Sequence, residues 1–119
     1  MQIDGYFNLR DESVLKLGVG SSLIEVLVDT GFSGSLIVPS EIANGLDLQF
    51  EGPEEFQTAN GEMVLADAGS VEVNWLGDMI RVAIAAHKDF KEALLGGHML
   101  RNCRLTIDYG RRTVTIVKS

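Results

Sequence analysis

The sequence has few cysteines and no long apolar run, and each shortage excludes a class of protein. Cys103 is the only cysteine among 119 residues, so no disulfide forms within the chain. No stretch of about 18 apolar residues occurs, and the opening MQIDGYFNLRDESV lacks a basic region followed by an apolar one. Neither a membrane span nor a signal peptide is predicted. These absences favour a protein of the reducing cytoplasm with no membrane partner.

Basic residues and histidines are also scarce, which narrows the partners and cofactors. Ten basic residues against 17 acidic ones give a net charge of −7, and this balance disfavours nucleic acid as a partner. Arg111-Arg112, the only adjacent basic pair, is interpreted as the tip of a hairpin. His87 and His98 stand at no metal-ligand spacing with Cys103. No metal and no other cofactor is expected.

The composition that remains is that of an ordered globular protein. Hydrophobic residues make up 45% of the chain, there are two prolines, and no low-complexity tract interrupts the sequence. A chain of this length buries roughly two-thirds of its extended surface, so a core forms without disulfide or metal. We expect residues 1–119 to form a single domain.

Short segments of alternating apolar and polar residues, separated by turn residues, predict strands. A short helix is expected over 41–43, after Pro39, and another over 97–102. This pattern favours a mostly β fold, a small barrel or sandwich with one or two short helices. The predicted strands are 14–19, 23–28, 36–38, 55–58, 63–68, 69–75, 79–86, 104–109 and 113–117.

One tripeptide places a carboxylate where a buried strand is predicted to end. Asp29-Thr30-Gly31 directly follows the apolar run that finishes with Leu27-Val28. A carboxylate at the end of a buried strand is held rigidly, and Gly31 allows the backbone to turn so that its N–H approaches the carboxylate. Thr30 adds a hydroxyl that can hydrogen-bond inside the structure. The tripeptide alone is a weak signal, but its position makes Asp29 a candidate functional carboxylate.

Two further elements follow in the sequence. Gln57 to Val64 reads as two extended arms joined by Asn60-Gly61, which favours a two-residue type I′ turn. Leu94-Leu95-Gly96-Gly97 repeats the pattern of an apolar pair followed by glycine. Taken alone, the hairpin is as well explained by an ordinary connection between strands.

In order and spacing, these three elements resemble the retropepsin-like aspartic proteases. Leu27 to Gly31 matches the apolar-apolar-Asp-Thr-Gly motif, the Asn60-Gly61 hairpin lies where that family has its flap, and Leu94-Leu95-Gly96 matches its second apolar-apolar-Gly element. The resemblance covers nearly the whole chain. The closing LRNCRLTIDYGRRTVTIV is similar to the bacterial and archaeal members. The resemblance implies a small closed β-barrel of the retropepsin type.

The chemistry of peptide hydrolysis makes one such motif half of a site. One carboxylate must take a proton from water while another gives a proton to the scissile carbonyl and then to the leaving amine. Since the chain has one Asp-Thr-Gly, the resemblance implies a C2 homodimer in which the two Asp29 carboxylates share a proton and activate a water. The substrate implied is an extended peptide or an unfolded protein.

The resemblance also implies roles for the neighbouring residues. Thr30 would hydrogen-bond across the dimer axis, and Gly31 would donate its N–H to the carboxylate. Gly96 would be the structural glycine of the second element. Substrate would contact the flap tip and the cleft, formed by Ala59, Asn60, Gly61, Phe32 and Ile37.

Departures from the family keep two hypotheses open. Phe32 stands where retroviral enzymes have Ala and pepsins have Ser or Thr, and Gly97-His98 stands where retroviral enzymes have an Arg-Asn or Arg-Asp pair that braces the dimer. Residues 113–119 read as the second arm of a local hairpin instead of an interleaved terminal strand. The chain is either a homodimeric aspartic endopeptidase or a catalytically weak or inactive module for peptide binding or dimerisation, and the intact Asp29 motif favours the first.

Overall fold

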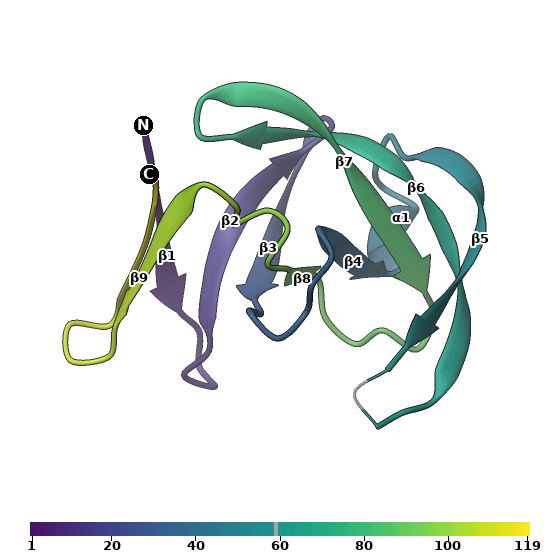
Figure 1. Ribbon diagram of the computed structural model, residues 1–119, viewed down its shortest axis with the longest axis horizontal. Coiled ribbons are helices and arrows are strands. Elements are labelled where there is room, and N and C mark those ends of the chain that lie inside the picture. Colours follow the sequence, from purple (N-terminus) through teal and green to yellow (C-terminus); the bar gives the residue numbers. More distant parts are fainter. Residues whose placement is uncertain (59) are drawn as a thin grey trace.

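The computed structural model describes residues 1–58 and 60–119, so the predicted role of Ala59 lies outside the described residues. Within these ranges the chain forms ten strands and one short helix, α1 (Ser40–Ala43). The longest strands, β6 and β7, form a hairpin in the upper part of Figure 1. The strands are β1 (Gln2–Phe7), β2 (Ser13–Val19), β3 (Ser22–Val28), β4 (Leu36–Pro39), β5 (Gln49–Gln57), β6 (Met63–Trp75), β7 (Asp78–His87), β8 (Leu94–Leu95), β9 (Cys103–Asp108) and β10 (Thr113–Lys118).

Six of the strands pair in a ring. The order β6-β7-β4-β8-β3-β2 returns to its start because β2 pairs again with β6, through Gly18 with Asn74 and Val19 with Val73. Strand β8 lies between β3 and β4, parallel to the first and antiparallel to the second. The ring therefore places β8 between two strands that lie more than fifty residues earlier in the sequence.

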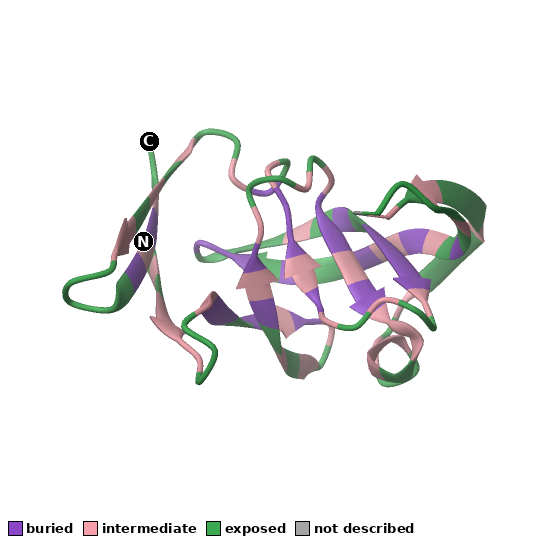
Figure 2. Cartoon of the chain, turned by 90° about the horizontal axis from the view of Figure 1, so that it is seen from below, coloured by how far each residue is buried: buried purple, intermediate pink, exposed green. Residues whose placement is uncertain are grey.

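Alternation along the ring strands produces the core. In β2, Leu15, Leu17 and Val19 are buried while Lys16 between them is exposed. Strand β6 repeats this pattern with Val71 and Val73 on the buried side. Because successive side chains of a strand point to opposite faces, each strand contributes one face to a common interior. Figure 2 shows the buried residues concentrated in these central strands.

The chain ends form a small sheet beside the ring. Strands β1 and β9 flank β10, with Gln2 opposite Val117 and Thr113 opposite Asp108. Figure 2 shows this sheet projecting from the body of the molecule on the side where both termini lie. The predicted local hairpin over 104–117 is confirmed. Strand β1 was not predicted, because Asp4 and Gly5 interrupt its apolar pattern.

Several predicted boundaries are wrong. Residues 63–75 form one strand, β6, instead of two, because β7 pairs along it from Asp67 to Trp75 without a break. Strand β5 begins at Gln49, six residues before the predicted start at 55; it pairs with β6 and accommodates a register shift between Phe50 and Gly52.

The predicted helix over 97–102 is also wrong, whereas the short helix after Pro39 is confirmed as α1. Residues 97–102 form successive turns. The N–H of Met99 donates to Gly96 O at 3.1 Å and that of Leu100 to Gly97 O at 3.0 Å, so the bonds span three residues instead of the four of an α-helix. Among the described residues, no helix has the length and apolarity needed to cross a membrane.

Candidate active site

Asp29 lies directly after β3, where backbone hydrogen bonds hold it. Strand β8 runs parallel to β3, pairing Val28 with Leu95, and the N–H of Asp29 donates to Leu95 O at 2.9 Å. One step earlier the N–H of Leu27 donates to Ala93 O at 2.8 Å. The backbone of Asp29 is therefore fixed by the ring, and its half-buried side chain lies at the start of the loop over residues 29–35, which we call the Asp29 loop.

The Asp29 loop turns back on its own carboxylate. The N–H of Gly31 donates to Asp29 Oδ1 at 3.0 Å, and the N–H of Phe32 donates to Asp29 O at 3.2 Å. A backbone N–H that donates to a carboxylate oxygen fixes the orientation of the carboxylate. This is the arrangement that the glycine two positions after the aspartate predicts.

Phe32 packs against two glycines, Gly34 and Gly96, and we call these residues together with the Asp29 loop the floor of the site. A Cβ added to Gly96 would lie 2.2 Å from Gly34 O and 2.5 Å from the Phe32 ring, and one added to Gly34 would lie 2.6 Å from the same ring. The ring of Phe32 thus packs directly against both glycines. This contact explains the residue that departs from the family pattern: a large ring occupies the space that two missing side chains leave.

The second apolar-apolar-Gly element braces this floor from below. The N–H of Gly96 donates to Ser35 O at 2.9 Å, and the N–H groups of Gly97 and His98 donate to carbonyls of the Asp29 loop. Ser35 is the buried polar residue at the end of that loop. Gly97-His98 therefore braces the Asp29 loop within its own chain through backbone groups, and the His98 side chain is exposed.

A cavity of about 500 Å³ opens over Asp29, and we call it the Asp29 cavity. Four residues that the sequence singled out, Asp29, Gly31, Phe32 and Ile37, meet there, whereas Thr30, Asn60 and Gly61 are not in its lining. The other described residues that line it are Phe56, Gln57, Thr58, Asp89, Phe90, Lys91, Glu92 and Leu94. Sequence reasoning missed these residues, apart from Gln57, Thr58 and Leu94, which belong to motifs it had identified.

The β5–β6 hairpin and the β7–β8 loop form the outer wall of this cavity. The rings of Phe56 on β5 and Phe90 in the loop meet edge to face at 6.4 Å, and His87 lies 5.5 Å from Phe90. In Figure 1 the hairpin tip and the β7–β8 loop both lie along the lower side of the molecule. Aromatic contact thus links the end of β7 to the hairpin.

The predicted two-residue turn at the hairpin tip is wrong. The last strand pair is Gln57 with Met63. Beyond it the N–H of Thr58 donates to Glu62 O at 2.8 Å and the N–H of Gly61 to Thr58 O at 3.0 Å. The connection is therefore longer than two residues, and Gly61, at φ 88°, supplies the left-handed conformation that closes it.

The described residues contain no cluster of side chains suited to bind a metal ion. Across residues 1–58 and 60–119, no three His, Cys, Asp or Glu side chains come together as metal ligands would. Cys103 is a half-buried residue at the start of β9.

Comparison with solved structures identifies the fold. A retropepsin-like aspartic protease from Rickettsia conorii is similar with a TM-score of 0.72 and 23% identity, over 98% of this chain and 89% of that one. The EIAV protease in complex with the inhibitor HBY-793 is similar with a TM-score of 0.68 and 18% identity, over 80% of this chain and 90% of that one. No protein-family model and no curated protein matches the sequence. The chain has a mostly β, retropepsin-like fold, as its motifs predicted.

Proposed function

We propose that this protein is an aspartic endopeptidase that acts as a C2 homodimer, with one Asp29 from each subunit. The observation that carries the proposal is Asp29 itself. Its backbone is hydrogen-bonded to β8, its carboxylate accepts the N–H of Gly31, and it lines a cavity of about 500 Å³ in a retropepsin-like fold. This geometry supports a carboxylate that must keep a fixed position through a reaction cycle.

The proposed reaction needs one ionised and one protonated carboxyl group. Two carboxyl groups in close contact share a single proton, because the repulsion between two negative charges at short range prevents both from ionising. A water between the Asp29 carboxyl groups attacks the scissile carbonyl carbon and gives its proton to the ionised group, while the protonated group gives its proton to the carbonyl oxygen. The tetrahedral intermediate then breaks its C–N bond as the first carboxyl group gives the proton it took from water to the nitrogen and the second takes a hydroxyl proton from the intermediate. The starting protonation state is restored, and no covalent enzyme intermediate forms.

The exposed groups around the site fit an assembly of two chains. Thr30 is exposed in the single chain, beside the half-buried Asp29, so its hydroxyl is available to a second copy at the axis. Each dimer would carry two β5–β6 hairpins, which we propose act as flaps over the bound peptide, with Asn60 and Gly61 near the tips. An extended peptide would pair its backbone with the cleft in the manner of an added strand. A reducing cytoplasm is the proposed compartment.

A second candidate rests on Phe32. Its ring packs against Gly34 and Gly96, so the position after the motif offers no hydroxyl to Asp29. A module that binds peptides or dimerises, with little or no turnover, is consistent with that departure.

The decisive experiment compares wild type with Asp29→Asn on a mixed peptide library between acidic and neutral pH, with products sequenced by mass spectrometry. We expect wild type to cut and Asp29→Asn to lose at least about a thousandfold in kcat/KM, because the shared proton and the water base are both removed. Asp78→Asn is the matched control. Asp78 is an exposed carboxylate at the start of β7 that pairs with Lys118 of β10, and the variant should cut normally.

Three results would contradict the proposal: no cleavage by wild type at concentrations where it is dimeric, equal cleavage by Asp29→Asn, or a strict monomer in sedimentation at high concentration. Statine-type mimics, whose hydroxyl replaces the attacking water, should inhibit wild type. Peptide binding without cleavage would instead favour the second candidate.

A further inference from the structure

Glu92 separates the Asp29 cavity from a second, neighbouring one. It lies in the β7–β8 loop, two residues before β8, and lines both. The second cavity, which we call the Glu92 cavity, has a volume of about 370 Å³. Its other lining residues are Asn8, Glu12, Val14, Ile24, Glu25, Leu27, Ile42 and Ala93. A group bound over Asp29 thus has a second compartment directly behind one wall residue.

The Glu92 cavity combines an apolar part with a rim of carboxylates. Val14, Ile24 and Leu27 are among its five apolar residues, and three glutamates supply its charge. No lysine or arginine belongs to its described lining, whereas Lys91 lines the Asp29 cavity. A lysine or arginine side chain has the matching construction, since an apolar stem carries a cationic end.

Each of the three carboxylates keeps capacity to accept a further bond. Glu12 Oε1 accepts from Asn8 Nδ2 at 3.0 Å, and Glu92 Oε1 accepts from Arg10 at 3.3 Å. Glu25 Oε2 accepts from the Tyr6 hydroxyl, and this hydrogen bond raises the pKa of Tyr6. Among the described residues, the second oxygen of each glutamate has no side-chain partner within hydrogen-bond distance.

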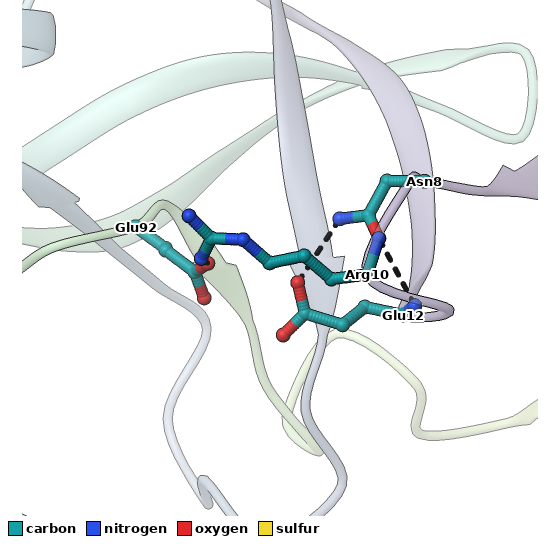
Figure 3. Close-up of polar contacts among 4 residues, drawn as sticks. All are labelled: Asn8, Arg10, Glu12 and Glu92. Atoms are coloured by element: carbon teal, nitrogen blue, oxygen red, sulfur yellow. Dashed lines mark hydrogen bonds and ion pairs between the residues drawn. The ribbon is translucent and has the colours of Figure 1, made fainter.

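Glu92 already binds a guanidinium, that of Arg10 in the same chain. Figure 3 shows the Arg10 side chain extending from the β1–β2 loop across to Glu92, above Glu12. The pair is weak: the two atoms are 3.3 Å apart, and the Arg10 side chain is 78% exposed against 37% for Glu92. A guanidinium supplied by another molecule can therefore replace Arg10 at little cost.

We propose that the Glu92 cavity is a specificity subsite that takes a lysine or arginine side chain of the bound peptide, with Glu92 as the specificity-determining residue. The proposal rests on the proposed function to the extent that a peptide lies over Asp29. In a C2 dimer the two copies of this cavity would flank the scissile bond, so a basic residue is favoured on either side of it.

The test uses the full-length dimer and matched peptides that differ at one position. A peptide cut by wild type is scanned with Lys, norleucine and Glu at each position, and kcat/KM is measured for every peptide. At one position on each side, wild type should prefer Lys over norleucine about fivefold, the range of a partly exposed ion pair. Glu92→Gln should remove that preference through KM, and Glu92→Lys should reverse it in favour of Glu.

Two further variants separate this role from a structural one. Arg10→Gln removes the internal competitor and should raise the Lys preference above that of wild type. Glu72→Gln is the matched control, because Glu72 pairs with Arg81 at the same 3.3 Å across β6 and β7, away from both cavities. It should leave every ratio unchanged.

Binding provides a readout that does not depend on turnover. Asp29→Asn and Asp29→Asn/Glu92→Gln are titrated with the fluorescent Lys and norleucine peptides, and anisotropy gives Kd. The inference is overturned if the Lys preference is absent in binding, or if Glu92→Gln leaves it intact in either assay. If the peptides bind with the expected Lys preference but wild type does not cleave them, the proposed endopeptidase function is wrong and the proposed subsite is supported.

Discussion

The floor and the cover of the Asp29 cavity are built in opposite ways. On the floor, the Asp29 loop is fixed by backbone bonds from β8 and from the turns after it, and a ring packs against two glycines with no room for a Cβ. The cover is the β5–β6 hairpin. Most residues of β5 are exposed, and Gly61 and Glu62 near the tip are exposed as well. The part that holds the candidate catalytic carboxylate is thus tightly packed and hydrogen-bonded, whereas the hairpin that covers it is exposed, and we expect the hairpin to open more readily.

Gly96→Ala should break the floor and gives the largest expected effect. Its Cβ would lie 2.2 Å from Gly34 O and 2.6 Å from Phe32 O, and backbone atoms cannot yield as flexible side chains do. We expect a loss of about 3 kcal/mol or more in the free energy of unfolding, measured by urea denaturation.

Gly97→Ala is the matched control for that substitution. The nearest atom to its Cβ would be Phe32 O at 3.6 Å, which is ordinary contact. It should unfold within about 1 kcal/mol of wild type. Equal losses for the two variants would show that the floor is not tightly packed.

Two phenylalanines, one in each region, give the next largest difference. Phe32→Ala empties the space above two glycines in the floor and should cost about 2 to 3 kcal/mol. Phe56→Ala removes a half-buried ring whose edge contact with Phe90 spans 6.4 Å, and should cost about 1 kcal/mol. Denaturant midpoints of both variants test the ranking, and the reverse order would contradict the rigid-floor interpretation.

Gly61→Ala should have the smallest effect on stability and a local one. At φ 88° an alanine is strained by about 1 kcal/mol, which the exposed hairpin can relieve by fraying. We expect faster amide hydrogen exchange at the N–H groups of Thr58 and Gly61, unchanged exchange at Asp29, and a severalfold fall in kcat/KM. Gly45→Ala, exposed and without positive φ, is the control. Altered exchange at Asp29 would mean that cover and floor are not independent.

The sequence allowed much of the ring to be predicted, because its strands are short apolar-rich segments with partial alternation, separated by turn residues. Residues 14–19 and 23–28 were predicted within one residue of β2 and β3. Alternation failed where pairing overrides it: β1 has Asp4 and Gly5 in its middle, and β5 has Gly52 and Pro53, yet both are held by a partner strand. At residues 97–102, successive turns with bonds spanning three residues stand where an α-helix was predicted.

The candidate site divides in the same manner. Asp29, Gly31, Phe32 and Ile37 lie close together in the sequence or in one recognisable motif, and local rules bring them to one cavity. Residues 89–92, which line the cavity wall, carry no recognisable motif. Their sequence pattern therefore does not predict that they face Asp29, about sixty positions away along the chain.

Local sequence alone predicts the candidate catalytic element, an aspartate at the end of a buried strand that is followed by a glycine whose N–H reaches it. These features depend on residues within two positions of each other, so backbone geometry alone fixes them. Only the tertiary structure decided that Phe32 packs on Gly34 and Gly96, and that Glu92 divides two cavities. Those contacts depend on the insertion of β8 between β3 and β4, which is a property of the closed ring and of no single segment.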